Sequence, residues 1–136
     1  MNVKGVLVSG VVGGVVIFVV WLIVGILVQV TGLYNVMSLG GMRAVNDPIM
    51  LLFFLHPWII SFAISIVYSQ LGKALEGTVV RRGVNFGLLM WITLSIPSAF
   101  IVYTSMNYPA SFAVVSVVGS LVYMIAAGIA TARIMK

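Results

Sequence analysis

The sequence predicts an all-α integral membrane protein, a four-helix bundle with both termini in the cytoplasm. Two observations on composition lead there. The chain has 136 residues, of which 62% are hydrophobic and only 7% are charged, whereas soluble domains carry about 25% charged residues. The apolar residues form long runs, and the few charges lie between them. This pattern excludes a soluble enzyme, and the absence of cysteine excludes a disulfide-stabilised secreted module.

Four apolar stretches are long enough to cross a membrane, since a helix needs about 20 apolar residues to span a hydrocarbon core of about 30 Å. We therefore expect a single membrane domain over residues 1–136. Its spans cover about 5–31, 48–70, 83–104 and 109–132, with an outer loop over about 32–47. The first stretch is much longer than the apolar core of a signal peptide and no cleavage motif follows it, so we expect it to be retained.

Local signals mark two of the span boundaries. Asp47 followed by Pro48 is typical of an N-cap and a proline at the first helical position, where a missing N–H costs nothing. Pro109 predicts a similar start for the fourth span. Only residues 105–108 separate the third and fourth spans, so these two helices are expected to be antiparallel neighbours.

The basic residues predict the orientation of the bundle. With four spans, six of the seven lysines and arginines fall on the side that also holds both termini, and only Arg43 falls on the other. Lysine and arginine concentrate in short cytoplasmic loops, so this side is expected to face the cytoplasm. The net charge of +5 is then a topology signal and an attraction to anionic lipid headgroups. We expect no nucleic-acid partner.

Small residues recur on the spans in patterns typical of helix packing. Within lipid, helices associate mainly through close backbone approach at small residues and through interhelical hydrogen bonds. The positions concerned are Gly10, Gly14, Gly25 and Gly32 on one face of the first span, Ser61 and Ser65 on the second, and Ser116 and Ser120 on the fourth. The alternative for the serines is that they line a polar path, rather than bonding back to carbonyls one turn earlier.

A candidate polar layer lies at similar depth in two spans. His56, the only histidine, precedes Pro57 in the second span, and Pro97 interrupts the third span between Ser95 and Ser98. An ionisable residue inside a membrane is a functional candidate by default. Three interpretations of His56 stay open: a hydrogen-bonded structural residue at a kink, part of a permeation or proton path, and a cofactor-binding ligand to a pigment, haem or metal.

The inventory of reactive groups argues against catalysis. Without cysteine there is no thiolate nucleophile and no iron–sulfur site. The only acids, Asp47 and Glu76, lie in loops, so His56 has no carboxylate at its depth to orient it. We expect no enzyme activity, no dedicated metal site and no bound cofactor.

Three segments carry a resemblance: residues 41–48, residues 82–89, and residues 96–109. Together they resemble small, uncharacterised four-span membrane proteins of prokaryotes, including archaea. The resemblance covers about half of the chain and implies the same number of spans, but no activity.

The leading functional hypothesis from the sequence is a non-catalytic membrane protein that works by helix–helix association. It would act as a homo-oligomer or as a small accessory subunit of a membrane complex. The alternative is a homo-oligomeric channel or facilitator for a small neutral or cationic solute, built around His56, Pro57 and Pro97.

Overall fold

The structure is a computed structural model that describes residues 2–136. Its elements in chain order are α1 (Val3–Thr31), the 3₁₀ turn η1 (Val36–Ser38), α2 (Met50–Phe53), α3 (His56–Leu71), the 3₁₀ turn η2 (Gly72–Ala74), α4 (Val79–Met90), the π-helical segment η3 (Trp91–Ser95), α5 (Ile96–Ser105) and α6 (Ala110–Ile134). No strand occurs within residues 2–136. The prediction of an all-α chain is therefore confirmed.

Within the described residues, three helices are long and apolar enough to cross a membrane. They are α1, the continuous helix Val79–Ser105 formed by α4, η3 and α5, and α6. The second stretch differs from the single helix predicted over about 48–70, because a turn at Phe54 and Leu55 divides it into α2 and α3. Pro57 explains the division, since its ring and its missing N–H are compatible with the first turn of a new helix but not with a helix interior.

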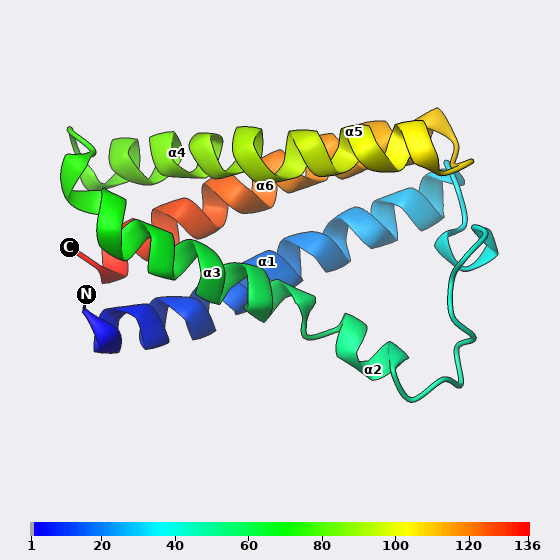
Figure 1. The fold of residues 1–136 in the computed structure, drawn as a ribbon, viewed down its shortest axis with the longest axis horizontal. Helices are drawn as coiled ribbons and strands as arrows, with labels where there is room; N and C mark the ends of the chain where they lie inside the picture. Colours follow the sequence, from blue (N-terminus) through cyan, green and yellow to red (C-terminus); the bar gives the residue numbers. More distant parts are fainter. Residues whose placement is uncertain (1) are drawn as a thin grey trace.

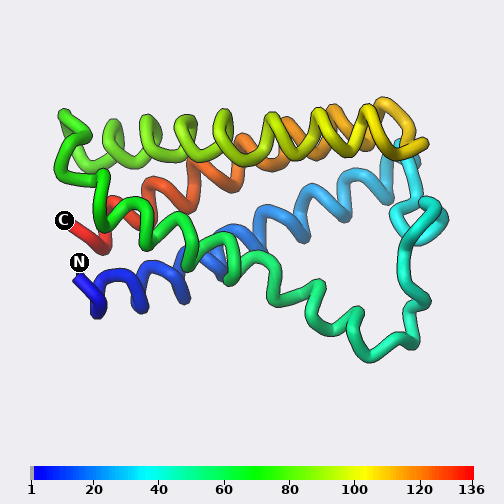
Figure 2. The backbone as a smooth tube through the Cα atoms, in the orientation of Figure 1, coloured from blue at the N-terminus to red at the C-terminus, as the bar shows by residue number. Residues whose placement is uncertain are grey.

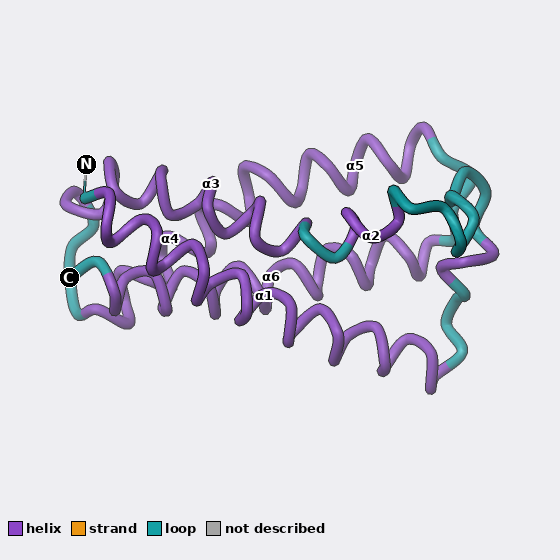
Figure 3. Tube along the Cα trace, turned by 90° about the horizontal axis from the view of Figure 1, so that it is seen from below, coloured by secondary structure: helices purple, strands orange, loops and turns teal. Residues whose placement is uncertain are grey.

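The helical segments run between two ends of the molecule. Figures 1 and 2 show both termini at one end, beside the connection between α3 and α4, and the long loop between α1 and α2 at the other. We call these the terminal end and the loop end. In the view of Figure 3, the loop segments gather at the two ends, apart from the short break between α2 and α3.

Small residues bring α1 and α3 together near the terminal end. A Cβ added at Gly10 would collide with the ring of Phe62, and one added at Gly14 would collide with the ring of Trp58. Next to the Gly10–Phe62 contact, on its side toward the terminal end, the buried hydroxyls of Ser9 and Ser65 are 2.7 Å apart and hydrogen-bonded. The two helices therefore combine close approach with an interhelical hydrogen bond, as expected for helices packed in lipid.

The contact between α4 and α6 is closer still, because backbone meets backbone. A Cβ at Gly87 would lie 2.5 Å from the carbonyl oxygen of Met124, and one at Gly83 would lie 2.5 Å from the Cα of Ile129. On the facing helix, Gly128 approaches the backbone of both glycines. The spacing of Gly83 and Gly87 is the small-xxx-small pattern of membrane helix pairs.

The core lies where these two helix pairs meet. Phe86 and Ala127 are fully buried, and Ile17, Ile64 and Tyr68 are nearly so. The rings of Tyr68 and Phe86 pack edge to face with centroids 4.9 Å apart, the arrangement that aromatic pairs favour. The terminal end of the molecule is therefore filled by side chains.

The loop end is packed less tightly. Beyond the core, the second half of α1 and the segment containing α2 diverge, and residues 32–49 connect them (Figure 1). Gly32 follows the last residue of α1 and caps the helix, and its left-handed φ of 66° suits glycine. The loop is held to the start of α6, because the Tyr108 hydroxyl donates to the carbonyl of Gly40 at 2.9 Å.

Candidate functional site

A cavity of about 590 Å³ lies between the helices in the half of the molecule toward the loop end. Its wall comes from the second half of α1, the loop, the region of α2 and α3 around His56, and the first half of α6. Ile17 belongs both to this wall and to the core. The packed core therefore bounds the cavity on the side of the terminal end.

A second cavity of about 430 Å³ adjoins the first, between the start of α3, the α5 region and α6. The two spaces share part of their walls. The shared residues are His56, Ile60, Phe112, Ser116, Ser120 and Tyr123. We call the two spaces together the loop-end cavity.

His56 reaches this cavity because the helix is interrupted before it. Leu55 precedes α3, and its carbonyl accepts hydrogen bonds from the N–H groups of Trp58 and Ile59 at 3.0 and 3.1 Å. His56 is therefore the first residue of α3, and it lines both parts of the cavity. Pro57, which the sequence pairs with it, is buried and lines the first part.

The third predicted span contributes its serines through an irregular segment. Residues 91–95 form a π-helix directly before α5, and the indole N–H of Trp91 donates to the carbonyl of Val117 on α6 at 2.9 Å. π-Helical turns are rare and often lie at functional sites. Ser95 and Ser98 line the second part of the cavity, whereas Pro97, at the first turn of α5, does not.

Besides His56 on α3 and the serines of η3 and α5, α6 also contributes polar side chains to the cavity. Ser116, Ser120 and Tyr123 are spaced four and three residues apart, so they share one face of the helix. Ser120 donates to the carbonyl of Val117 at 2.9 Å, which leaves the lone pairs of its oxygen available. The cavity thus brings together His56 and hydroxyl groups from η3, α5 and α6.

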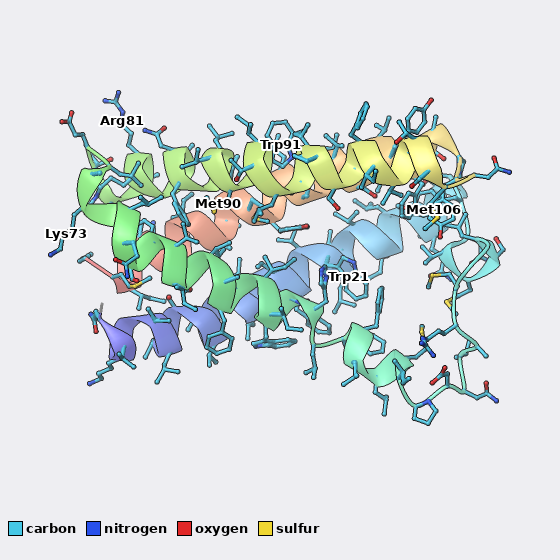
Figure 4. All side chains as sticks on the ribbon, viewed as in Figure 1. Trp21, Lys73, Arg81, Met90, Trp91 and Met106 are labelled. Atoms are coloured by element: carbon cyan, nitrogen blue, oxygen red, sulfur yellow. The ribbon has the colours of Figure 1, made fainter. Side chains whose placement is uncertain are left out.

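Aromatic rings bridge α1 and the α2–α3 segment where these begin to diverge. The Trp21 ring packs edge to face against Phe53, with centroids 5.1 Å apart, and lies 6.3 Å from Phe54. Phe18 contacts Trp58 with centroids 5.5 Å apart. Figure 4 shows Trp21 on α1 next to the gap that opens toward α2. Of these rings, those of Trp21 and Phe53 belong to the wall of the first part of the loop-end cavity.

The small residues predicted to pack helices do not all serve one purpose. Gly10, Gly14, Ser61 and Ser65 lie in the α1–α3 contact, where the Ser61 hydroxyl donates to the carbonyl of Ser9 at 3.3 Å. Ser116 and Ser120 line the loop-end cavity. Gly25 and Gly32 have no atom within 4 Å of an added Cβ. These two glycines therefore make no close helix contact within the chain.

Several residues of this arrangement were missed by the sequence reasoning. Tyr123 and Trp91 were not singled out, although Tyr123 shares a helix face with Ser116 and Ser120. Gly83, Gly87 and Gly128 carry the tightest helix contact. The four-residue spacing of Gly83 and Gly87 could have indicated it.

Charged groups lie away from the cavity. Within residues 2–136, no three His, Asp or Glu side chains come together in a way that could hold a metal ion. Asp47 pairs with Arg43 at 2.9 Å in the exposed loop. The backbone N–H of Ile49 and the Arg43 guanidinium both donate to Asp47, and they hold the pKa of its carboxyl below the usual value.

Comparison with known proteins adds no neighbour: no family model, curated protein or solved structure matches the chain.

Proposed function

We propose that this chain is a four-span integral membrane protein with both termini in the cytoplasm. The α2–α3 segment is the fourth crossing beside the three long helices. The basic residues support the orientation, because six of the seven lie at the start of α1, in the α3–α4 connection, in the first turn of α4 and at the end of the chain after the middle of α6. These are Lys4, Lys73, Arg81, Arg82, Arg133 and Lys136. Figure 4 shows Lys73 and Arg81 at the terminal end, which the preference of basic loops places in the cytoplasm.

Cysteine labelling tests this topology directly, since the chain has no cysteine of its own. In intact cells, Lys4→Cys, Glu76→Cys and Lys136→Cys are expected to be protected from a membrane-impermeant maleimide, and Val45→Cys in the loop is expected to react. Labelling of Lys4→Cys and Lys136→Cys from opposite sides would contradict the four-span arrangement.

The loop-end cavity is the working part of the protein in this proposal, and its role is to take up a small neutral solute and assist its passage through the membrane. One observation carries it: His56 and hydroxyl groups from η3, α5 and α6 line a common cavity. Ser95 and Ser116 are half-buried, and His56 and Ser98 line the cavity while also being exposed at the surface of the chain. Polar groups that line a cavity within a membrane helix bundle are typical of solute pathways. No acid lines either part of the cavity, so a cationic solute finds no counter-charge there, and catalysis is not proposed.

A single chain offers a pocket and not a pore, because the core bounds the cavity toward the terminal end. Passage therefore requires an opening of that packed half, or a path between copies in a homo-oligomer. Conformational opening of this kind is the general mode of alternating access.

Flux into liposomes tests the proposal. The purified protein is expected to accelerate the entry of small uncharged solutes, and His56→Ala and Ser116→Ala are expected to reduce that rate. Ser69→Ala is the matched control, because Ser69 bonds to the carbonyl of Ile66 and lies outside the cavity. No flux above that of empty liposomes, or equal flux from all three variants, would remove the proposal.

Helix–helix association, as a homo-oligomer or as an accessory subunit, is the second candidate. Gly25 favours it, since this glycine at the edge of the cavity is exposed on a membrane-length helix and an added Cβ there meets no atom within 4 Å. Small residues of this kind allow a helix of another copy or subunit to approach closely. Native mass spectrometry of gently solubilised membranes distinguishes a self-assembly from a subunit of a larger complex, and a monomer alone would exclude both.

A further inference from the structure

The loop-end cavity has walls of two different kinds. One wall carries the hydrogen-bonding groups of His56, Ser116 and Tyr123. The side formed by α1 and α2 is mostly apolar and carries the rings of Trp21 and Phe53, while Gln29, Tyr34 and Tyr108 add polar groups near the loop. The first part alone measures about 590 Å³, within the range of about 300–1,000 Å³ typical of small-molecule sites. This division fits a molecule with one polar group and a larger apolar body.

No charged residue lines either part of the cavity. Aspartate, glutamate, lysine and arginine are all absent from both walls. A charged ligand in such a place would remain uncompensated within the low dielectric of the membrane. The ligand is therefore uncharged.

The cavity reaches the lipid-facing surface of the molecule. Leu22 and Ile26 belong to its wall, yet 41% and 59% of their surfaces are exposed. They lie on the half of α1 that diverges from α2 (Figure 1). A lipid-soluble molecule can thus approach sideways from the bilayer, past the edge formed by Trp21 and Phe53.

The polar wall favours a ligand that can donate a hydrogen bond. The Ser120 hydroxyl donates its hydrogen bond to the carbonyl of Val117. Toward the cavity, the Ser120 oxygen can therefore only accept a hydrogen bond. A neutral histidine and a tyrosine can each accept or donate. A hydroxyl group satisfies all of these partners, whereas an ester or ketone oxygen can only accept.

Resting on the proposed role of the cavity, we propose that its natural ligand class is an uncharged, lipid-soluble alcohol that enters sideways from the bilayer. Its hydroxyl group lies among His56, Ser116 and Tyr123, and its apolar chain lies against the rings of Trp21 and Phe53. The free phospholipid acyl chain and a helix of a second copy are the competing occupants.

Photolabelling separates these occupants. The full-length protein in zwitterionic phospholipid vesicles is labelled with three probes that share one diazirine-bearing chain: a long-chain alcohol, the matching carboxylate and the matching hydrocarbon. The alcohol is expected to label cavity residues saturably, with competition by unlabelled alcohol. The hydrocarbon is expected to label exposed faces such as that of Val118 without saturation.

Variants connect the labelling to the cavity. Gly25→Leu extends into the cavity where an added Cβ meets no atom within 4 Å, so it is expected to abolish saturable labelling without disturbing the fold. His56→Ala and Ser116→Ala are each expected to weaken the apparent affinity for the alcohol about two- to tenfold, the usual effect of one lost hydrogen bond. Neither should alter labelling by the hydrocarbon. Val118→Leu, on the exposed face of α6, is the control and should change nothing.

Several outcomes would overturn the inference. Equal labelling by all three probes means that only ordinary lipid chains occupy the cavity, and preferential labelling by the carboxylate contradicts a neutral ligand. Cavity residues that cross-link to a second copy instead identify a helix as the occupant. Solute flux is measured in parallel. Alcohol binding without flux would contradict the transport role but support the alcohol site. Flux without alcohol binding would support the transport role but contradict the alcohol site.

Discussion

Replacing Gly87 by alanine is expected to destabilise the protein through the α4–α6 contact alone. The new Cβ would lie 2.5 Å from the carbonyl oxygen of Met124, whereas ordinary van der Waals contact begins at 3.4 Å. Because the neighbour is backbone and cannot rotate away, the two helices must separate locally by about 0.9 Å. Overpacking of this kind costs about 1–3 kcal/mol.

The matched control is Gly25→Ala on α1, where an added Cβ meets no atom within 4 Å. Both substitutions gain the same helix propensity, about 0.5–1 kcal/mol, so their difference isolates the packing cost. Unfolding in dodecyl maltoside micelles titrated with sodium dodecyl sulfate, followed by far-UV circular dichroism, measures the free energy of unfolding of each variant. Equal stability of the two variants would refute the close backbone contact of α4 with α6.

Three further predictions concern other parts of the molecule. Ser9→Ala and Ser65→Ala are each expected to destabilise the fold, and their double-mutant cycle should give a coupling of about 0.5–1.5 kcal/mol for the buried hydrogen bond; additive effects would contradict that bond. Gly14→Leu should reduce the stability of the monomer itself because Trp58 occupies the space, whereas Gly25→Leu should leave it folded; a thermal-shift assay compares them, and equal losses would be contradictory. The pKa of Asp47 is lowered by the Ile49 N–H and by Arg43, so the loop turn should be ordered above the unperturbed carboxyl pKa of about 3.9 and should loosen as the pH falls through the lower folded value. Amide exchange at Ile49, compared with Asp47→Asn, checks this, and protection that does not change with pH would count against it.

The sequence alone predicted an all-α chain with membrane-length helices, and it predicted the extent of most of these helices. The predicted stretches over about 5–31, 83–104 and 109–132 correspond to helices Val3–Thr31, Val79–Ser105 and Ala110–Ile134. Such stretches are readable because long apolar runs and the positions of charges need no knowledge of neighbours. The sequence also shows directly which reactive groups the chain lacks, because the absence of cysteine and of acids within the apolar runs needs no knowledge of the fold.

The folded structure was needed to tell which small residues pack against another helix and which line the cavity. Gly14 and Gly25 look alike in the sequence, yet one contacts Trp58 and the other contacts nothing within 4 Å of an added Cβ. α1 is apolar on nearly every side, so hydrophobic periodicity does not distinguish a packing face from a lipid-facing one. The turn at Phe54 and Leu55, the π-helical segment before Pro97 and the divergence of α1 from α2 together create the cavity around His56. Each depends on how helices distant in sequence meet, which is a property of the folded chain.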